Sequence, residues 1–542
     1  MALANIDLVI VAIYAAALLA IAVFVSREPA GESKDTEDYF LAGKSLPWWA
    51  IGASLIAANI SAEQIIGQSG QGFVVGLAIA AYEWQAAIVL LIVAKYFLPI
   101  FLERNIYTMP QFLETRFGGE VKSIMAVFWI ALYTTVNLTS ILWLGGLAIS
   151  AVTGWAVLPS MAGLAAFSVL YSLYGGLKAV ALTDIIQVVI LIIGGFAITW
   201  IALGLVGGES GAIGGLSTLM SEIPGHFEMI LDKDNKSYGD LPGIWTLLGG
   251  LWVLHFSYWG FNQYIIQRAL GAESLGEAQK GLAFAAFLKL LIPLIVVIPG
   301  IAALWLAQNG TLDIAELSPD VCSMVDGEEV CGKPDRTYGV LMALVPAGLR
   351  GLVFAALIAA IVSSLASMMN SIATIFTMDI YRDYIARDKS ESHYVTVGRV
   401  TAFSAMVMAL ILAKPFLGGM ESAFQTIQEY TGFIAPGIVA VFLLGFFWKR
   451  ANTAGAFALL ISSILLNLAA KFGLPDMPFV LRIWIVFLIC LVIGVIVSLV
   501  TKPPHEDQPV DIGGINLATR TGFNISAAVI TVVLIWIYVV FW

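Results

Sequence analysis

The sequence predicts an all-α polytopic membrane protein with about 14 transmembrane helices. Of its 542 residues, 60% are hydrophobic and only 12% are charged, whereas a soluble chain carries about 25% charged residues. The mean hydropathy is +0.91. The apolar runs are continuous over about 20 residues, long enough for helices to cross a bilayer, and they do not alternate as the strands of a membrane barrel do.

The expected spans are separated by polar loops. In order, they cover residues 6–26, 46–68, 73–100, 122–150, 155–173, 180–206, 243–268, 281–307, 339–378, 395–415, 424–448, 452–473, 478–501 and 521–542. Lys and Arg, Arg268 among them, concentrate in the odd-numbered loops, so the positive-inside rule places these loops in the cytoplasm. An even number of spans then puts both termini outside. No basic residue precedes the first run, which predicts a retained span and not a cleaved signal peptide.

Two outside loops, 208–242 and 308–338, are long and acidic, and we expect short surface helices in them. Cys322 and Cys331 share the second loop, where a disulfide is chemically permitted but not required by the sequence. The third cysteine, Cys490, lies within a span.

The stretch 54–68 lies in the second span yet carries polar residues at mid-depth. These are Asn59, Ser61, Glu63, Gln64 and Gln68. Such groups are costly in a bilayer unless they line a cavity or bind a solute, which favours a helix unwound at 57–61 over a simple kink. Span seven is interrupted in the same way at 254–268, five helices later. This order predicts one transmembrane domain over 1–542, with inverted repeats at 46–207 and 243–448, a leading helix at 6–26 and three peripheral helices within 452–542.

Glu83 and Lys289 are ionisable residues inside spans, and neither charge is stable alone in hydrocarbon. One interpretation is a purely structural ion pair. We favour a shared pocket for a neutral polyol, because charged groups and amides bind hydroxyls while an aromatic ring stacks on the C–H face of a sugar. His255 lies in the second interrupted span, and we assign it to the same pocket.

Ser363 and Ser364 lie in a small, hydroxyl-rich run of the ninth span. Hydroxyls together with the carbonyls of an unwound helix suit Na+, a hard cation that prefers oxygen ligands. The alternative is that these serines only pack a helix interface. Asp184 either relays a cation towards the cytoplasm or caps the following helix.

Several function classes are not supported. The net charge of −10 argues against a nucleic acid partner. The sequence contains no complete phosphate-binding loop, zinc-protease motif or nucleophile elbow, so it predicts neither an ATP-driven pump nor an enzyme. It indicates no organic cofactor and no obligate protein partner.

Six stretches make the chain resemble the solute:sodium symporter family, and most closely its bacterial sodium/galactose members. They are 36–49, 57–64, 174–180 with Thr183 and Asp184, 258–268, 362–367 and 427–432. The resemblance covers nearly the whole chain. It implies a leucine-transporter-type fold and Na+-driven sugar uptake by alternating access across the plasma membrane, which would be the inner membrane of a bacterium.

The resemblance also implies roles for individual positions. Those that match sugar contacts are Gln64, Glu83, His255, Lys289 and Gln428. Tyr258 would stack on the sugar as the inner gate beside Trp259, and Gln68, Tyr82 and Phe424 match outer-gate positions. The Na+ ligands would be the carbonyls of Ala57, Ile60 and Ala360 with the hydroxyls of Ser363 and Ser364. Asp184 would help the ion leave.

Three positions depart from the galactose pattern. Ala86 stands where the relatives have Ser, His255 where they have Asn, and Gln68 where they have Met. The lost Ser hydroxyl removes one hydrogen bond, worth about 1 kcal/mol. We therefore expect a sugar but leave galactose open. The alternatives are a Na+- or H+-coupled symporter for another small solute, such as a polyol or an amino acid, and a membrane sugar sensor that does not transport.

Overall fold

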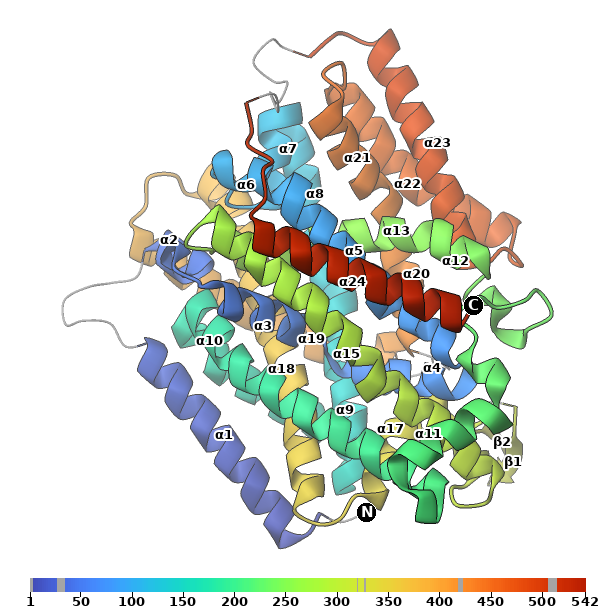
Figure 1. The fold of residues 1–542 in the computed structure, drawn as a ribbon. Coiled ribbons are helices and arrows are strands. Elements are labelled where there is room, and N and C mark those ends of the chain that lie inside the picture. The colour runs from blue at the N-terminus through green and yellow to red at the C-terminus, as the bar shows by residue number, and fades with distance from the viewer. Residues whose placement is uncertain (1–2, 27–34, 319, 326–327, 418–422, 505–513) are drawn as a thin grey trace.

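The computed structural model describes residues 3–26, 35–318, 320–325, 328–417, 423–504 and 514–542, which form a nearly all-helical bundle (Figure 1). Among these residues, 11 helices are long and apolar enough to cross a membrane, or up to 12 if the bent pair Trp48–Asn59 and Glu63–Val74 is one span. The prediction of a helical membrane protein is confirmed.

The described elements follow one another in two halves of the chain, with η for 3-10 and π segments. The first half contains α1 (Asn5–Ser26), α2 (Thr36–Leu41), η1 (Ala42–Lys44), α3 (Trp48–Asn59), η2 (Glu63–Gln68), α4 (Ser69–Val74), η3 (Leu77–Ala80), α5 (Ala81–Ile92), η4 (Val93–Phe97), α6 (Leu98–Glu103), α7 (Met109–Phe117), α8 (Gly119–Leu132), η5 (Tyr133–Leu138), α9 (Thr139–Thr153), α10 (Val157–Gly207), η6 (Gly208–Ser210), α11 (Gly211–Glu222), η7 (Pro224–Phe227) and η8 (Lys236–Gly239). The second half contains α12 (Ile244–Leu248), α13 (Gly250–His255), η9 (Phe256–Gly260), α14 (Gln263–Leu270), α15 (Leu275–Gln308), α16 (Ile314–Leu317), β1 (Cys322–Val325), β2 (Glu328–Cys331), η10 (Pro334–Arg336), α17 (Thr337–Leu344), α18 (Leu349–Ile375), η11 (Phe376–Ile385), α19 (Glu391–Leu417), α20 (Ala423–Gly432), α21 (Ala435–Phe447), α22 (Thr453–Gly473), α23 (Phe479–Val500) and α24 (Thr521–Val540).

Two of the fourteen expected spans correspond to shorter helices. The segment 243–268 is divided among α12, α13, η9 and α14, and the span at 155–173 overlaps the short apolar helix Val157–Leu170. We expected a loop after the latter, but α10 continues to Gly207 and is interrupted only at Gly176, where φ is 61°. A Cβ atom there would collide with the carbonyl oxygen of Tyr39, so only glycine permits both the kink and the contact with α2.

The predicted break in the second span is present. α3 ends at Asn59, Ile60 is extended (φ −80°, ψ 96°), and the helical path resumes at an angle of 63°. Gln64 replaces the missing helical contacts, since its Oε1 atom accepts hydrogen bonds from the Ser61 amide at 3.0 Å and the Ser61 hydroxyl at 2.9 Å.

The predicted break in the seventh span is also present. Between η9 and α14, Phe261 and Asn262 leave the helical path. The Asn262 side chain then caps α14 by accepting a hydrogen bond of 3.1 Å from the Tyr264 amide.

The helices group around these two interruptions (Figure 1). α15 packs against α3, α4 and α5, and α10 packs against α18. α1 lies along the outside of α10 and α18, while α21, α22 and α23 form a group at another edge. α24 crosses over α15 and α5. The interrupted helices therefore lie inside the bundle, where other helices shield their polar groups from lipid.

The two long loops contain the expected short elements. The first carries α11, η7 and η8; the second carries α16 and the antiparallel hairpin β1–β2. Cys322 and Cys331, left open by the sequence, form a disulfide across this hairpin. Cys490 is buried in α23.

Candidate functional site

A polar cavity of about 70 Å³ lies where the two interrupted spans meet. It is lined by residues of α3, η2, α5, α13, η9, α15 and α20, among others. Nine predicted pocket and gate residues line it: Gln64, Gln68, Tyr82, Glu83, His255, Tyr258, Trp259, Lys289 and Gln428. Small-molecule sites usually measure about 300–1,000 Å³, so the side chains themselves fill much of this space.

The two intramembrane charges meet in this cavity. Lys289 and Glu83 are 1% and 2% exposed, and the Lys289 ammonium donates to Glu83 Oε2 and to Asn59 Oδ1. Gln68 Nε2 donates to the other Glu83 oxygen at 2.7 Å. The ammonium also lies 4.9 Å from the centroid of the Trp259 ring. The ion pair is therefore structural, as one interpretation held, and it also lines the cavity, as the other required.

Three buried polar atoms in the cavity wall lack a hydrogen-bond partner among the described residues. They are Gln68 Oε1, the Tyr82 hydroxyl and His255 Nε2. Nearly all buried polar atoms in proteins are paired, so these three atoms can accept or donate hydrogen bonds to water or to a polar solute in the cavity. Gln68 and His255 are also two of the positions that depart from the galactose pattern.

Two pairs of aromatic rings lie at or beside the cavity. In the first, Tyr258 accepts a hydrogen bond of 3.1 Å from Asn59 Nδ2 and contacts the Trp259 ring edge-on at 5.1 Å between centroids. In the second, Tyr82, which lines the cavity, and Phe424 are edge-on at 5.4 Å. Tyr258 and Trp259, predicted at the inner gate, are thus in contact, and so are Tyr82 and Phe424, predicted at the outer gate.

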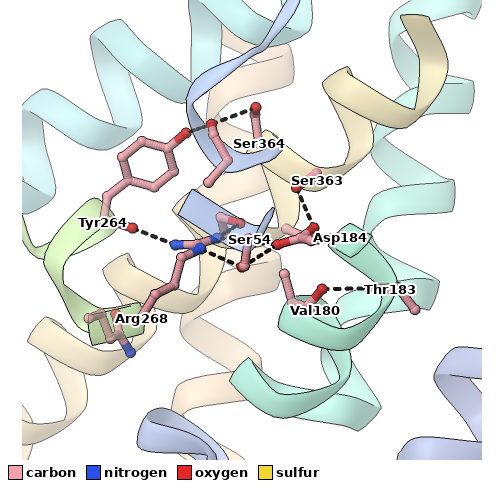
Figure 2. A network of polar contacts seen from close by, with 12 residues as sticks. Ser54, Val180, Thr183, Asp184, Tyr264, Arg268, Ser363 and Ser364 are labelled. Carbon is pink, nitrogen blue, oxygen red and sulfur yellow. Dashed lines mark hydrogen bonds and ion pairs between the residues drawn. The ribbon is translucent and has the colours of Figure 1, made fainter. Parts of the chain in front are cut away.

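The predicted cation region lies next to the break, on the α10 and α18 side (Figure 2). The Ser364 hydroxyl donates to the Ala58 carbonyl at 2.8 Å, and the Ser363 hydroxyl donates to Asp184 Oδ1 at 2.5 Å. Asp184 Oδ2 accepts from the Ser54 hydroxyl at 2.5 Å. Asp184 lies well inside α10 and does not begin a helix, so the capping alternative is wrong.

The residues present fit a hard cation in chemical type. Ala57 and Ile60 lie where α3 ends, and the last carbonyls of a helix lack intrahelical partners. Ala360 lies one turn before Ser364 on α18. All five predicted ligands therefore supply neutral oxygens, which Na+ prefers.

Arg268 was expected in a cytoplasmic loop, and this expectation is wrong. Its side chain is 1% exposed within α14, and it donates to Ser54 Oγ at 2.7 Å and the Tyr264 carbonyl at 2.6 Å, and also to Ser367 Oγ (Figure 2). Nη2 lies 3.8 Å from Asp184 Oδ2. A guanidinium can be buried when its donors are satisfied, and this one places a fixed positive charge beside Asp184.

Asn59 is another residue that the sequence analysis did not assign to the site. It accepts from Lys289 and donates to Tyr258, so it joins the ion pair to the inner aromatic pair. Its place in the polar stretch 54–68 was a usable signal, but the side-chain partners of an amide cannot be read from its position.

Membrane helices arranged around two interrupted spans, with a buried polar cavity between the breaks, define a secondary transporter. The chain belongs to the sodium:solute symporter family, which matches residues 39–462.

Individual relatives support this assignment. The chain is 51% identical to a sodium/glucose cotransporter of Vibrio parahaemolyticus over 541 residues, 100% of this chain and 99% of the relative. It is 36% identical to the sodium/myo-inositol cotransporter 2 of Mus musculus over 454 residues, 80% of this chain and 66% of the relative. Among solved structures, a Na+-coupled sialic acid symporter has a TM-score of 0.79 at 22% identity, covering 92% of this chain and 99% of that one. This last likeness concerns the fold.

Proposed function

We propose that this protein takes up a neutral monosaccharide together with Na+ by alternating access across the plasma membrane. The observation that carries the proposal is the buried network of Lys289, Glu83 and Gln68 beside the break in the second span. The relative that is 51% identical over the whole chain is named a sodium/glucose cotransporter, which supports glucose or a similar hexose.

The chemistry of the cavity suits hydroxyl groups. Glu83 accepts, Lys289 donates, and the amides of Gln64, Gln68 and Gln428 can do either. Because Glu83 neutralises Lys289, this pair leaves no free positive charge for a carboxylate substrate. A neutral sugar would exchange hydrogen bonds with these groups, and the ring of Tyr258 would supply the flat face.

Na+ is proposed to bind at the break in the second span. The ligands would be the carbonyls of Ala57, Ile60 and Ala360 and the hydroxyls of Ser363 and Ser364. Both hydroxyls would turn away from their present acceptors, Asp184 and Ala58, to present oxygen to the ion.

Coupling would follow if the ion and the sugar favour the same state, because linkage between two ligands is reciprocal. Ion binding would hold the second span against the ninth. Release towards Asp184 would loosen both spans and free Tyr258 from Asn59.

The finer architecture belongs to the same proposal. We assign two inverted five-helix repeats to residues 46–207 and 243–448, a leading helix to 6–26 and three peripheral helices to 452–542, giving 14 spans with both termini outside. The placement of one break in each half supports the repeat.

A cyclic polyol is a second candidate substrate. It presents the same neutral hydroxyls to the pocket, and the chain is similar to a relative named a myo-inositol cotransporter. An amino acid would need a free charged partner, which the Glu83–Lys289 pair does not offer.

Uptake of radiolabelled hexoses, pentoses and myo-inositol into proteoliposomes tests the proposal. Each solute is measured with an inward Na+ gradient, with choline in place of Na+, and with an inward proton gradient. Accumulation of one sugar only with Na+ supports the proposal. Accumulation driven by protons overturns the ion assignment, preference for inositol selects the second candidate, and binding without accumulation under every gradient identifies a sensor.

A further inference from the structure

A second cavity, of about 580 Å³, lies between the first turns of α15 and α24. Its walls are mostly apolar and include Phe284, Phe287, Phe523, Ile525, Val529 and Ile530. It shares no lining residue with the transport cavity. Phe287 and Val529 are 49% and 56% exposed, so the groove opens towards the lipid side of the bundle.

Two basic residues stand at one end of this groove. Arg520 immediately precedes α24, a helix of 20 residues whose first amides receive no side-chain cap from it. Among the described residues its guanidinium forms no ion pair, and it lies against α15, since a Cβ atom on Gly276 would be 3.1 Å from Arg520 Cζ. Lys280 also lines the groove, is 44% exposed and uses one contact, 2.9 Å to Glu277 Oε1.

The charges at this end do not cancel. Glu277 forms an ion pair with Lys280, accepts the Trp48 amide at 3.0 Å and also interacts with the charge of Arg520, so one carboxylate faces two cations. Arg520 and Lys280 line the same groove and Arg520 directly precedes α24, so two cations, one carboxylate and the positive end of a helix give this end a net positive charge. This combination suits a phosphate group.

The length of the groove matches half a bilayer. It follows α15 from Gly276 to Phe287 and α24 from Arg520 to Ile530, about 16 and 15 Å at 1.5 Å per residue. The hydrocarbon core of a bilayer is about 30 Å thick, so one leaflet contributes about 15 Å. The basic end lies on the side that is rich in Lys and Arg, which the positive-inside rule assigns to the cytoplasm.

We propose that this groove is a binding site for an anionic glycerophospholipid of the cytoplasmic leaflet. An acyl chain lies along the aromatic and aliphatic walls, and the phosphate binds Arg520, Lys280 and the first amides of α24. The lipid thereby fixes α24 to α15. A zwitterionic lipid binds more weakly, because its own cation opposes the positive end of the groove.

Native mass spectrometry on the full chain tests the site. The purified protein is titrated with palmitoyl-oleoyl-phosphatidylglycerol and, separately, with the matching phosphatidylcholine. Arg520→Gln and Lys280→Gln are each expected to weaken retention of phosphatidylglycerol about fivefold, and the double variant about thirtyfold, because each basic residue near a membrane surface contributes a factor of that size. Lys449→Gln, an exposed basic residue of another loop on the same side, is the matched control and should change nothing.

A third variant tests the apolar part. Ala283→Phe fills the groove and should abolish retention while the basic end stays intact. Thermal unfolding in detergent without lipid checks that every variant folds. Equal retention of the two lipids by the wild-type protein, or undiminished retention of phosphatidylglycerol by the double variant, would overturn the proposal. Competition by glycerol phosphate alone would also overturn it, since that shows a phosphate site without a lipid.

Discussion

Ser364 of α18 donates a hydrogen bond of 2.8 Å to the carbonyl oxygen of Ala58, in the last turn of α3 before the break. The same oxygen accepts a hydrogen bond from the Tyr264 hydroxyl of α14. One carbonyl therefore joins both interrupted spans to the ninth span. An ion bound at this break, as proposed, would change the contacts of all three helices together, which is what coupling between an ion and a distant gate requires.

Replacing Ser364 tests its proposed role as an ion ligand. Ser364→Ala removes one of the five proposed oxygen ligands, so we expect the Na+ concentration for half-maximal uptake to rise at least about tenfold. Ser364→Thr keeps the hydroxyl and should stay close to the wild-type value. An unchanged Na+ dependence in the alanine variant would exclude Ser364 from the ion site.

The contributions of Lys289 and Glu83 to the stability of the fold should be coupled. Glu83→Gln leaves the Lys289 charge buried without a counterion, which costs about 3–5 kcal/mol, so we expect a lower Tm and no uptake. Adding Lys289→Met should restore much of the Tm but not the uptake, because both proposed sugar contacts are removed. If the single and double variants unfold at the same temperature, the two groups are not coupled.

The stability that Arg268 contributes to the fold should depend on the shape of its side chain as well as on its charge. Arg268→Lys keeps the charge but cannot reach Ser54, Tyr264 and Ser367 together, so about 1–3 kcal/mol of stability should be lost. Arg387→Lys, on an exposed residue, is the control. The Tm values of the two variants are compared by thermal unfolding. Equal values would show that the branched, planar shape of the guanidinium is unimportant.

Asp7 attaches the leading helix to the bundle. Its Oδ1 atom accepts hydrogen bonds from the amides of Gly348 and Gly351 at 2.7 and 2.8 Å, so it caps α18 from a helix that is distant in sequence. Asp7→Ala should cost about 1–2 kcal/mol, as for other lost caps. Asp7→Asn keeps an acceptor and should cost less. Equal losses in the two variants, measured as Tm, would contradict the capping role.

His226, which lies outside the expected spans, should make the stability of the fold depend on pH. It lies in η7, where burial lowers the pKa of its imidazole. Below about pH 6.5 the unfolded chain binds a proton that the folded chain excludes, so this residue destabilises the fold as the pH falls. Between about pH 7.5 and 5.5, the Tm of the wild-type protein should fall more than that of His226→Gln. Parallel curves would show that His226 does not contribute.

The sequence was informative where burial makes a polar residue expensive. Glu83 and Lys289 could be paired from sequence because neither is stable alone in a bilayer, and the breaks at 57–61 and 254–268 followed from polar residues at mid-span. The structure brings these groups into one cavity. Their roles in transport remain predictions.

The sequence was uninformative where several helices combine. Arg268 is the basic residue that ends the seventh expected span, so the sequence predicts it in the following loop. The donors of its guanidinium are instead satisfied by partners on α3 and α18 that are distant in sequence. Similarly, the turn at 174–180 shows Gly and Lys, which suggest a loop, while the structure needs one glycine to bring α10 close to Tyr39.

The disulfide between Cys322 and Cys331 has a consequence for handling the protein in cells. Disulfides persist in oxidising compartments, so the bridge agrees with the outside placement that the Lys and Arg bias predicts for this loop. Because Cys490 is buried, the thiols that a reagent can reach are those released when this disulfide is reduced. On intact cells, a membrane-impermeant maleimide should label Cys322 and Cys331 only after mild reduction. Labelling would then show on which side of the membrane this loop lies, without an added tag.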